Sequence, residues 1–244
     1  MKQSVFISSV LVIALIISWV IFEYFMPTFI KEGGPLVIGL IAMTIMVATF
    51  IVERVFSLKK AQGRGSLAVF LKNVTMEINK SNIDAAIAAC DKQRGSCANV
   101  IRTGLDRYKI VLTEGAKDQK AVMEEIQHAI DEAMMLEVPL LEKNLVALST
   151  IASIATMWGL LGTVIGMIRS FGAMAKGGSA DPIQLALGIS EALINTAGGL
   201  IAAILGILAY NFFTTKVDNF TYMIDEASYS IIQTLATKEV KKSK

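Results

Sequence analysis

Four long uncharged stretches dominate the pattern of apolar and polar residues along the chain. Residues 5–22, 33–52 and 144–168 contain no charged side chain, and residues 182–215 contain a single one, Glu191. A bilayer with a hydrocarbon core of about 30 Å needs about 20 apolar residues of helix to be crossed. Each stretch is about that long or longer, so the pattern predicts an all-α polytopic membrane protein.

The segment between the second and third stretches has the periodicity of amphipathic helices. Asn82 is placed to cap a first helix, which Gly95 ends, and a second helix breaks near Gly115. A third helix begins near Asp118 and repeats apolar residues at four-residue spacing. Pro139 only kinks this helix, so we expect it to run on into the third uncharged stretch as a long cytoplasmic stalk.

The distribution of lysine and arginine predicts the orientation. Residues 53–143, the tail after residue 215 and Lys2 together hold 20 of them, whereas the remaining connections hold three. By the positive-inside rule, both termini lie in the cytoplasm of a protein that we expect in the bacterial inner membrane. Large residues follow the first stretch where a cleavage site needs small ones, which predicts an uncleaved anchor. The expected segments are an extra N-terminal transmembrane anchor (1–30), a transmembrane helix (31–56), a cytoplasmic helical domain and stalk (57–143), a second transmembrane helix (144–171), a periplasmic loop (172–183), a third transmembrane helix (184–215) and a cytoplasmic tail (216–244).

Composition and charge disfavour other classes of protein. Apolar residues make up 54% of the chain and charged residues 18%, whereas soluble domains have roughly 45–50% and about 25%. The net charge of +2 is too balanced for a nucleic-acid footprint. Two cysteines and one histidine are too few for a disulfide scaffold or a zinc site. We therefore expect no enzymatic activity, no metal, no cofactor and no nucleic-acid partner.

Small and hydroxyl-bearing residues recur along one face of each of the last two stretches. Their steps of three and four residues keep a helix face in register. The first seam comprises Ser149, Ala152, Thr156, Gly159, Thr163, Gly166 and Ser170, with Gly162 completing a GxxxG pair; the second comprises Gly188, Ala192, Thr196, Gly199, Ala203 and Gly206. The glycines and alanines favour close helix packing in lipid. The hydroxyls of Thr156, Thr163 and Thr196 could instead line a narrow hydrated path.

Glu191 is an acidic residue inside the fourth stretch. A carboxylate near mid-membrane costs several kcal/mol unless it is paired, protonated or hydrated, and such residues usually mark ion routes. Ser190 and Asn195 are placed to hydrogen-bond it, whereas Thr196 lies about 140° around the helix and need not face the same cavity. A lone acid also suggests that a partner protein supplies a second group. Alternatively, Glu191 lies only nine residues past Pro182 and extends to the outer headgroups.

Several motifs resemble a known family. Gly159-Leu-Leu-Gly-Thr-Val-Ile-Gly-Met167 is similar to the GLLGTVxGM signature of the ExbB/TolQ/MotA proton-channel family. Gly188 to Ala197 is similar to its GISEALxxTA motif, and Tyr210-Asn211 matches the YN pair that follows. Gly34-Pro35, at the start of the second stretch, resembles the opening of the family's first helix. The resemblance covers about residues 33–218 and, within the family, is greatest to ExbB.

The resemblance implies a pentameric ring whose last two transmembrane helices line a pore. An ExbD-like single-span protein with a proton-carrying aspartate would occupy that pore. The ring would couple the proton-motive force to a TonB-like protein that works outer-membrane receptors. Thr163 and Thr196 match the family's polar pore-lining positions and Glu191 its intramembrane glutamate. With Thr156 and Asn195 they form the ion pathway that we expect.

The chain departs from the family pattern in three respects. Thr156 and Leu205 stand where the family usually has proline, which predicts straighter pore helices. The stretch at residues 5–22 is additional to the usual three-helix plan.

Two kinds of function remain as alternatives to an ExbB-like subunit. One is a TolQ-like envelope, flagellar stator or gliding motor subunit, and the other is a non-conducting membrane scaffold. The ion is also open, since hydroxyl-lined pores could serve sodium as well as protons.

Overall fold

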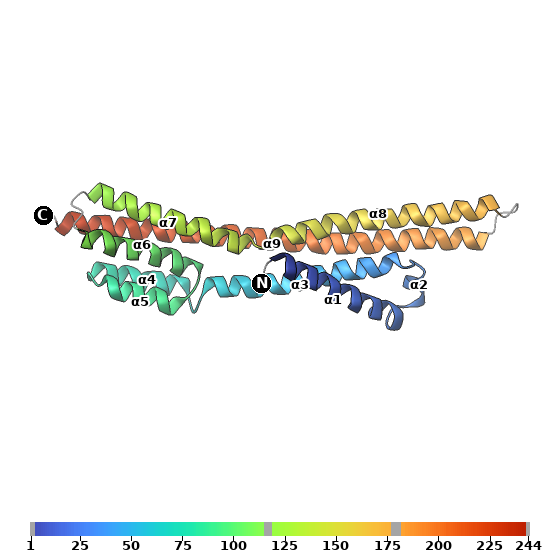
Figure 1. Cartoon of the computed structure of the whole chain (residues 1–244), viewed down its shortest axis with the longest axis horizontal. Coiled ribbons are helices and arrows are strands. Elements are labelled where there is room, and N and C mark those ends of the chain that lie inside the picture. The colour runs from blue at the N-terminus through green and yellow to red at the C-terminus, as the bar shows by residue number, and fades with distance from the viewer. Residues whose placement is uncertain (1–2, 115–118, 177–181, 243–244) are drawn as a thin grey trace. The chain divides into compact units, whose positions relative to one another are not determined.

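The computed structural model describes residues 3–114, 119–176 and 182–242, and within them every regular element is a helix. The helices in Figure 1 are α1 (Gln3–Tyr24), α2 (Thr28–Lys31), α3 (Leu36–Gln62), α4 (Leu67–Asn79), α5 (Ile83–Gln93), α6 (Ser96–Thr113), α7 (Gln119–Glu142), α8 (Leu145–Lys176) and α9 (Pro182–Lys242). Four helical stretches are long and apolar enough to cross a membrane. The prediction of an all-α polytopic membrane protein is therefore confirmed.

The chain divides into two compact units. The first, which we call the membrane unit, comprises Met1–Arg54 and Asn144–Phe213, and it holds all four uncharged sequence stretches apart from the last two residues of the fourth. The second, which we call the helical unit, comprises Val55–Lys143 and Thr214–Lys244. Helices α3 and α9 contribute to both units, because each continues from one into the other. The segment expected to be a tail is thus helical through Lys242 and belongs to a folded unit.

The helix predicted to continue from the cytoplasmic segment into the third uncharged stretch is interrupted. Because α7 ends at Glu142 and α8 begins at Leu145, the prediction of one unbroken helix through this point is wrong. Asn144 has a φ of +66°, a left-handed conformation that asparagine adopts more readily than most residues. Pro139 lies inside α7 without ending it. The helix that does continue is α9, which is 61 residues long.

Within the membrane unit, α8 and α9 lie side by side and antiparallel (Figure 1). Their approach is close because glycines of one helix meet the backbone of the other. A Cβ on Gly159 would lie 3.1 Å from the Cα of Gly199, and a Cβ on Gly166 would lie 2.6 Å from the carbonyl oxygen of Gly188. A larger side chain at these positions would push the helices apart.

Gly162 meets the same interface, where its Cβ would lie 2.3 Å from the Cβ of Asn195. Helix α3 joins the pair through Trp158 of α8, whose indole N–H donates to the carbonyl oxygen of Leu36 at 3.0 Å. A Cβ on Gly39 would lie 2.9 Å from the Trp158 ring. Small residues therefore set the spacing of α3, α8 and α9.

Two positions where the resemblance implied proline are helical in this chain. Helix α8 runs unbroken through Thr156, and α9 runs unbroken through Leu205. Proline would remove a backbone donor and kink the helix at either position. Both helices can therefore continue with their regular hydrogen-bond pattern.

Helix α1 is apolar around most of its circumference. Ile16 and Trp19 are exposed, whereas Ala14 and Ser18, one turn apart, are buried. The hydroxyl of Ser18 donates to the carbonyl oxygen of Ala14 at 2.5 Å, so its polar atom is satisfied within the helix. This pattern is typical of a membrane helix that packs along a narrow stripe of small residues and faces lipid elsewhere.

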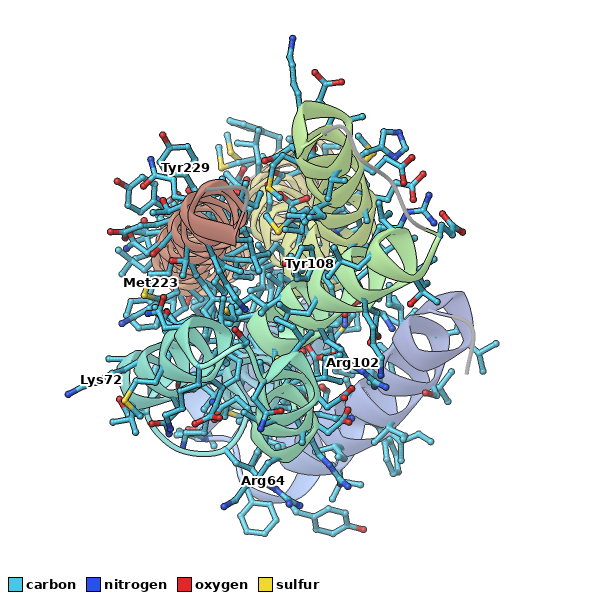
Figure 2. The ribbon with its side chains drawn as sticks, turned by 90° about the vertical axis from the view of Figure 1, so that its left-hand side faces the viewer. Arg64, Lys72, Arg102, Tyr108, Met223 and Tyr229 are labelled. Atoms are coloured by element: carbon cyan, nitrogen blue, oxygen red, sulfur yellow. The ribbon has the colours of Figure 1, made fainter. Side chains whose placement is uncertain are left out.

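The helical unit buries one face of each amphipathic helix. The carboxamide oxygen of Asn82 accepts the N–H of Ala85 at 3.0 Å, so the predicted cap at the start of α5 is confirmed. Tyr108 of α6 is 1% exposed and lies between helices, whereas Arg64 and Lys72 lie at the periphery (Figure 2). The core therefore forms on the apolar faces that the periodicity indicates.

Helix α6 ends at Thr113 and α7 begins at Gln119. The helix break predicted at Gly115 and the helix start predicted near Asp118 lie outside the described residues. The side of α7 that carries Val122, Ile126 and Ile130 is buried. The four-residue spacing of these residues therefore corresponds to the packed face of the helix.

The two cysteines are buried thiols in the helical unit, one in α5 and one in α6. Burial raises the pKa of Cys90 and that of Cys97 from 9.0 to about 12. For Cys90 the neighbouring Cys97 raises the pKa further. The unfolded chain therefore loses these protons first, and the stability that the thiols contribute below pH 9 is lost as the pH rises toward 12.

We expect both thiols to resist alkylation in the folded protein. The thiolate is the reactive form, and a pKa near 12 leaves roughly a thousandth of the thiolate found on a free cysteine at pH 8. Iodoacetamide at pH 8, followed by intact mass measurement, should modify neither cysteine in the native protein and both after unfolding. Rapid modification of the native protein would contradict the burial.

Candidate functional site

Glu191 is a buried carboxylate in the membrane unit. Its side chain is 8% exposed, and it forms an ion pair with the guanidinium of Arg169 across the α8–α9 interface. The Arg169 side chain is 55% exposed, so the cation of the pair reaches the surface. The acid is therefore neutralised within its own chain, by a cation that itself reaches the surface.

The turn before α3 closes over this ion pair. Gly34 has a φ of +71°, and a Cβ there would lie 2.9 Å from Oε1 of Glu191 and 3.8 Å from Nη1 of Arg169. Glycine supplies both the left-handed backbone and the close approach. The turn therefore limits access to the carboxylate from this side.

Polar side chains of α9 form hydrogen bonds to the same turn. The carboxamide nitrogen of Asn195 donates to the carbonyl oxygen of Gly33 at 2.8 Å and to the backbone oxygen of Glu191 at 2.9 Å. The hydroxyl of Ser190 donates to the carboxylate of Glu32 at 3.2 Å. Both residues therefore bond to backbone or to the turn, and not to the Glu191 carboxylate as the sequence suggested.

Asn195 also holds an unused acceptor. The residue is fully buried, and its Oδ1 accepts no hydrogen bond from the described residues. A buried amide oxygen without a donor is costly, and native proteins keep few of them. This buried acceptor lies one helical turn from Glu191, and the described residues supply no donor to it.

The three candidate threonines make separate hydrogen bonds. The hydroxyl of Thr196 reaches across the interface to the carbonyl oxygen of Gly159 at 3.4 Å. The hydroxyls of Thr163 and Thr156 donate to carbonyl oxygens of their own helix, at 2.6 and 3.2 Å. Thr156 is exposed and Thr163 is half-buried, so these two hydroxyls lie toward the outer surface of α8.

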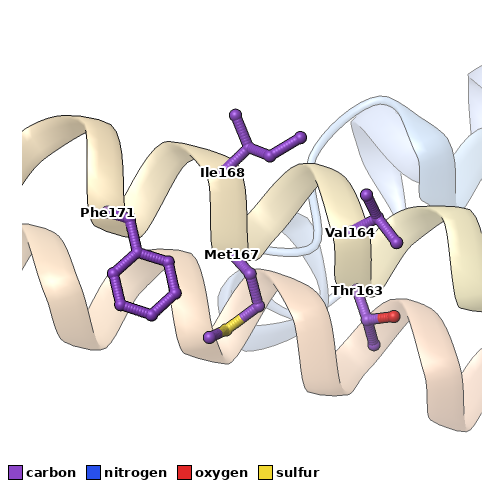
Figure 3. A pocket seen from close by; sticks show the side chains of 5 residues that line it. All are labelled: Thr163, Val164, Met167, Ile168 and Phe171. Atoms are coloured by element: carbon purple, nitrogen blue, oxygen red, sulfur yellow. The ribbon is translucent and has the colours of Figure 1, made fainter.

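Thr163 lies in an apolar groove on α8 with a volume of about 540 Å³. The groove is lined by Thr163, Val164, Met167, Ile168 and Phe171 (Figure 3). The Thr163 hydroxyl is the one polar side-chain group among these five residues. An apolar membrane-helix surface with a single hydroxyl is suited to contact another helix and poorly suited to hold a polar small molecule.

Arg169 is the site residue that sequence reasoning missed. It lies 22 residues before Glu191, beyond the predicted loop at 172–183, so no helical spacing links the two. Residues 177–181 of that loop lie outside the described residues. The available signal was that Arg169 immediately follows an uncharged stretch, in a hairpin whose second helix carries the lone acid.

Comparison with known proteins identifies a family whose match includes α8 and most of α9. The model of a family described as the MotA/TolQ/ExbB proton channel family matches residues 92–226. The chain is 31% identical over 183 residues to the putative biopolymer transport protein ExbB-like 3 of Synechocystis sp., covering 74% of this chain and 81% of the relative. It is 30% identical over 190 residues to the Tol-Pal system protein TolQ of Pseudomonas aeruginosa, covering 76% and 81%. It is 26% identical over 196 residues to the biopolymer transport protein ExbB of Pseudomonas putida, covering 80% and 57%.

Proposed function

Because the chain belongs to the MotA/TolQ/ExbB proton channel family, we propose that it is an ExbB-like ring subunit of a motor driven by the proton-motive force. Five copies form the ring in the bacterial inner membrane, with both termini in the cytoplasm. An ExbD-like single-span protein lies within the ring and carries the principal proton-binding group. A TonB-like protein transmits the energy to outer-membrane transport. Relatives named ExbB or ExbB-like support this branch of the family.

The observation that carries the proposal is the ion pair of Glu191 and Arg169 inside a membrane-spanning helix pair. Ionisable groups at such positions are costly, and proteins retain them chiefly on ion and substrate routes. A scaffold that only packs helices needs no such pair, since the glycine seams already bring α8 and α9 together. The pair therefore favours an ion-conducting complex over a non-conducting scaffold.

The remaining residues have separate roles in this proposal. Thr163 and Thr156 present hydroxyls toward the partner helix, because both lie toward the outer surface of α8. Thr196 keeps a hydroxyl at the α8–α9 interface, and Oδ1 of Asn195 offers an acceptor beside Glu191. Glu191 tunes the charge along the path and, with Arg169, responds to the partner's proton.

We expect Thr163→Val and Thr196→Val each to abolish energy coupling while the ring still assembles. Valine keeps the volume of threonine and removes the hydroxyl, so packing is retained and hydration of the path is lost. The measurement is uptake of a ferric siderophore in a strain that carries only the variant gene, with assembly followed by native electrophoresis.

Thr150→Val is the matched control. Thr150 is an exposed threonine of α8 that also bonds a carbonyl oxygen of its own helix, at 2.8 Å, and it lies off the seam of small residues. Its replacement should leave uptake unchanged. Normal uptake in the Thr163 and Thr196 variants would support the scaffold alternative instead.

A TolQ-like envelope motor is the second candidate, because TolQ of Pseudomonas aeruginosa matches this chain over a similar length and identity. Deletion of the gene separates the two. Loss of siderophore uptake supports the ExbB-like role, whereas leakage of periplasmic enzymes and detergent sensitivity support the TolQ-like role. Copurification from native membranes, followed by mass spectrometry and imaging of the ring, identifies the single-span partner.

A further inference from the structure

Two loops of the helical unit meet through their backbones. The N–H of Arg64, just after α3, donates to the carbonyl oxygen of Gln93 at 2.7 Å. Gly63 has a φ of +79°, and a Cβ there would lie 2.3 Å from the carbonyl oxygen of Arg94. The end of α3 and the α5–α6 connection therefore form one joined surface.

Five basic residues lie in or next to the segments that meet here, and we call them the basic cluster. They are Lys59, Lys60, Arg64, Lys92 and Arg94, all exposed. In the described part of the chain, none of the five forms an ion pair or a side-chain hydrogen bond. Their positive charges are therefore exposed and are not neutralised by a carboxylate in the described part of the chain.

Many other basic residues of the helical unit are paired. Those with a carboxylate partner are Lys80, Arg102, Arg107, Lys109 and Lys120. Asp91, beside Lys92 in the sequence, is bound to Arg102 at 2.9 Å and does not neutralise the cluster. The basic cluster thus carries unpaired positive charge next to the end of α3.

The position of the cluster along the chain indicates its partner. Lys59 follows the uncharged stretch at residues 33–52 by seven residues of the same unbroken helix. Seven residues of α-helix advance about 10 Å, which is close to the Debye length of about 8–10 Å at physiological salt. Lys59 and Lys60 lie at about this distance from the uncharged stretch, and basic residues so close to a bilayer interact with its anionic lipids.

We propose that the basic cluster binds the phosphate headgroups of anionic phospholipids. This inference goes beyond the proposed function, and it rests on α3 crossing the membrane and on the unpaired charges. Nucleic acid is a poorer fit, because the chain has a net charge of only +2 and the cluster follows a membrane span within the same helix. Headgroup binding would anchor the loop junction at the bilayer surface.

The test measures which lipids surround the full-length protein. The protein is reconstituted into phosphatidylcholine vesicles that contain a trace of spin-labelled phosphatidylglycerol or spin-labelled phosphatidylcholine. Electron spin resonance then gives the fraction of each label held at the protein. We expect a severalfold preference for phosphatidylglycerol that falls to about one in the variant K59Q/K60Q/R64Q/R94Q.

A matched control removes the same number of charges elsewhere in the helical unit. The variant K80Q/R102Q/R107Q/K109Q replaces basic residues that already have acidic partners, and it should keep the preference. Retention of the preference in the cluster variant, or its equal loss in the control, would overturn the proposal. Salt-sensitive binding of a labelled oligonucleotide that depends on the cluster, with no change in lipid preference, would assign the cluster to nucleic acid instead.

Discussion

Replacing Arg169 with glutamine is expected to destabilise the membrane unit by about 2–3 kcal/mol, whereas Glu191→Gln should cost less than about 1 kcal/mol. The first change leaves a carboxylate that is 8% exposed without its cation, whereas the second leaves an arginine that is 55% exposed and reaches the surface. The destabilisation expected for Arg169→Gln is smaller than the usual 3–5 kcal/mol for a fully buried pair, because the Arg169 side chain is 55% exposed. Unfolding in mixed micelles, followed by tryptophan fluorescence, measures the difference.

The double variant R169Q/E191Q distinguishes neutralisation from simple packing. If Arg169 acts by balancing the acid, the double variant should be about as stable as E191Q alone, which a double-mutant cycle reports as coupling. Arg102→Gln, in an exposed pair, is the control and should change stability by no more than about 0.5–1 kcal/mol. Equal destabilisation by the two single changes would refute the asymmetry.

Gly166→Ala is expected to separate α8 from α9 and to destabilise the membrane unit by about 1–3 kcal/mol. The added Cβ would lie 2.6 Å from the carbonyl oxygen of Gly188 and 2.9 Å from the backbone nitrogen of Ala192. Both neighbours are backbone atoms, so no side-chain rotation can relieve the contact. The same unfolding measurement, with ring assembly followed by size-exclusion chromatography, should show both losses.

Gly172→Ala supplies the control on the same helix. No atom lies within 4 Å of a Cβ at Gly172, so the change adds only helix propensity, and it should be neutral or stabilising by up to about 1 kcal/mol. Equal stability of the two variants would show that the close approach at Gly166 is relieved by motion of the helices.

Local pattern predicted the parts of the fold that depend on neighbours in the sequence. The uncharged stretches predicted the membrane-spanning helices, and the motif from Gly159 to Met167 indicated the family that the comparisons identify. Asn82 predicted a cap because a cap is made within four residues. The break at Asn144 was missed, because one left-handed residue leaves the apolar periodicity on both sides intact.

For the candidate site too, the sequence predicted only what depends on nearby residues. Glu191 stood out in the sequence because a single carboxylate in an apolar helix is costly wherever that helix packs. Its partner Arg169, the turn at Gly34 and the hydrogen bond from Asn195 to Gly33 join segments that are far apart in the chain. Such contacts depend on how α3, α8 and α9 pack, and spacing along one helix carries no information about them.

The sequence by itself determined that this chain crosses a bilayer with several helices and which family it belongs to, since both follow from runs of adjacent residues. The tertiary structure alone decided that the buried acid is balanced from within the chain and that the long continuous helix is α9. The physical reason is that hydrophobicity acts on each segment separately, whereas ion pairing and a backbone break depend on atoms that only folding brings into place.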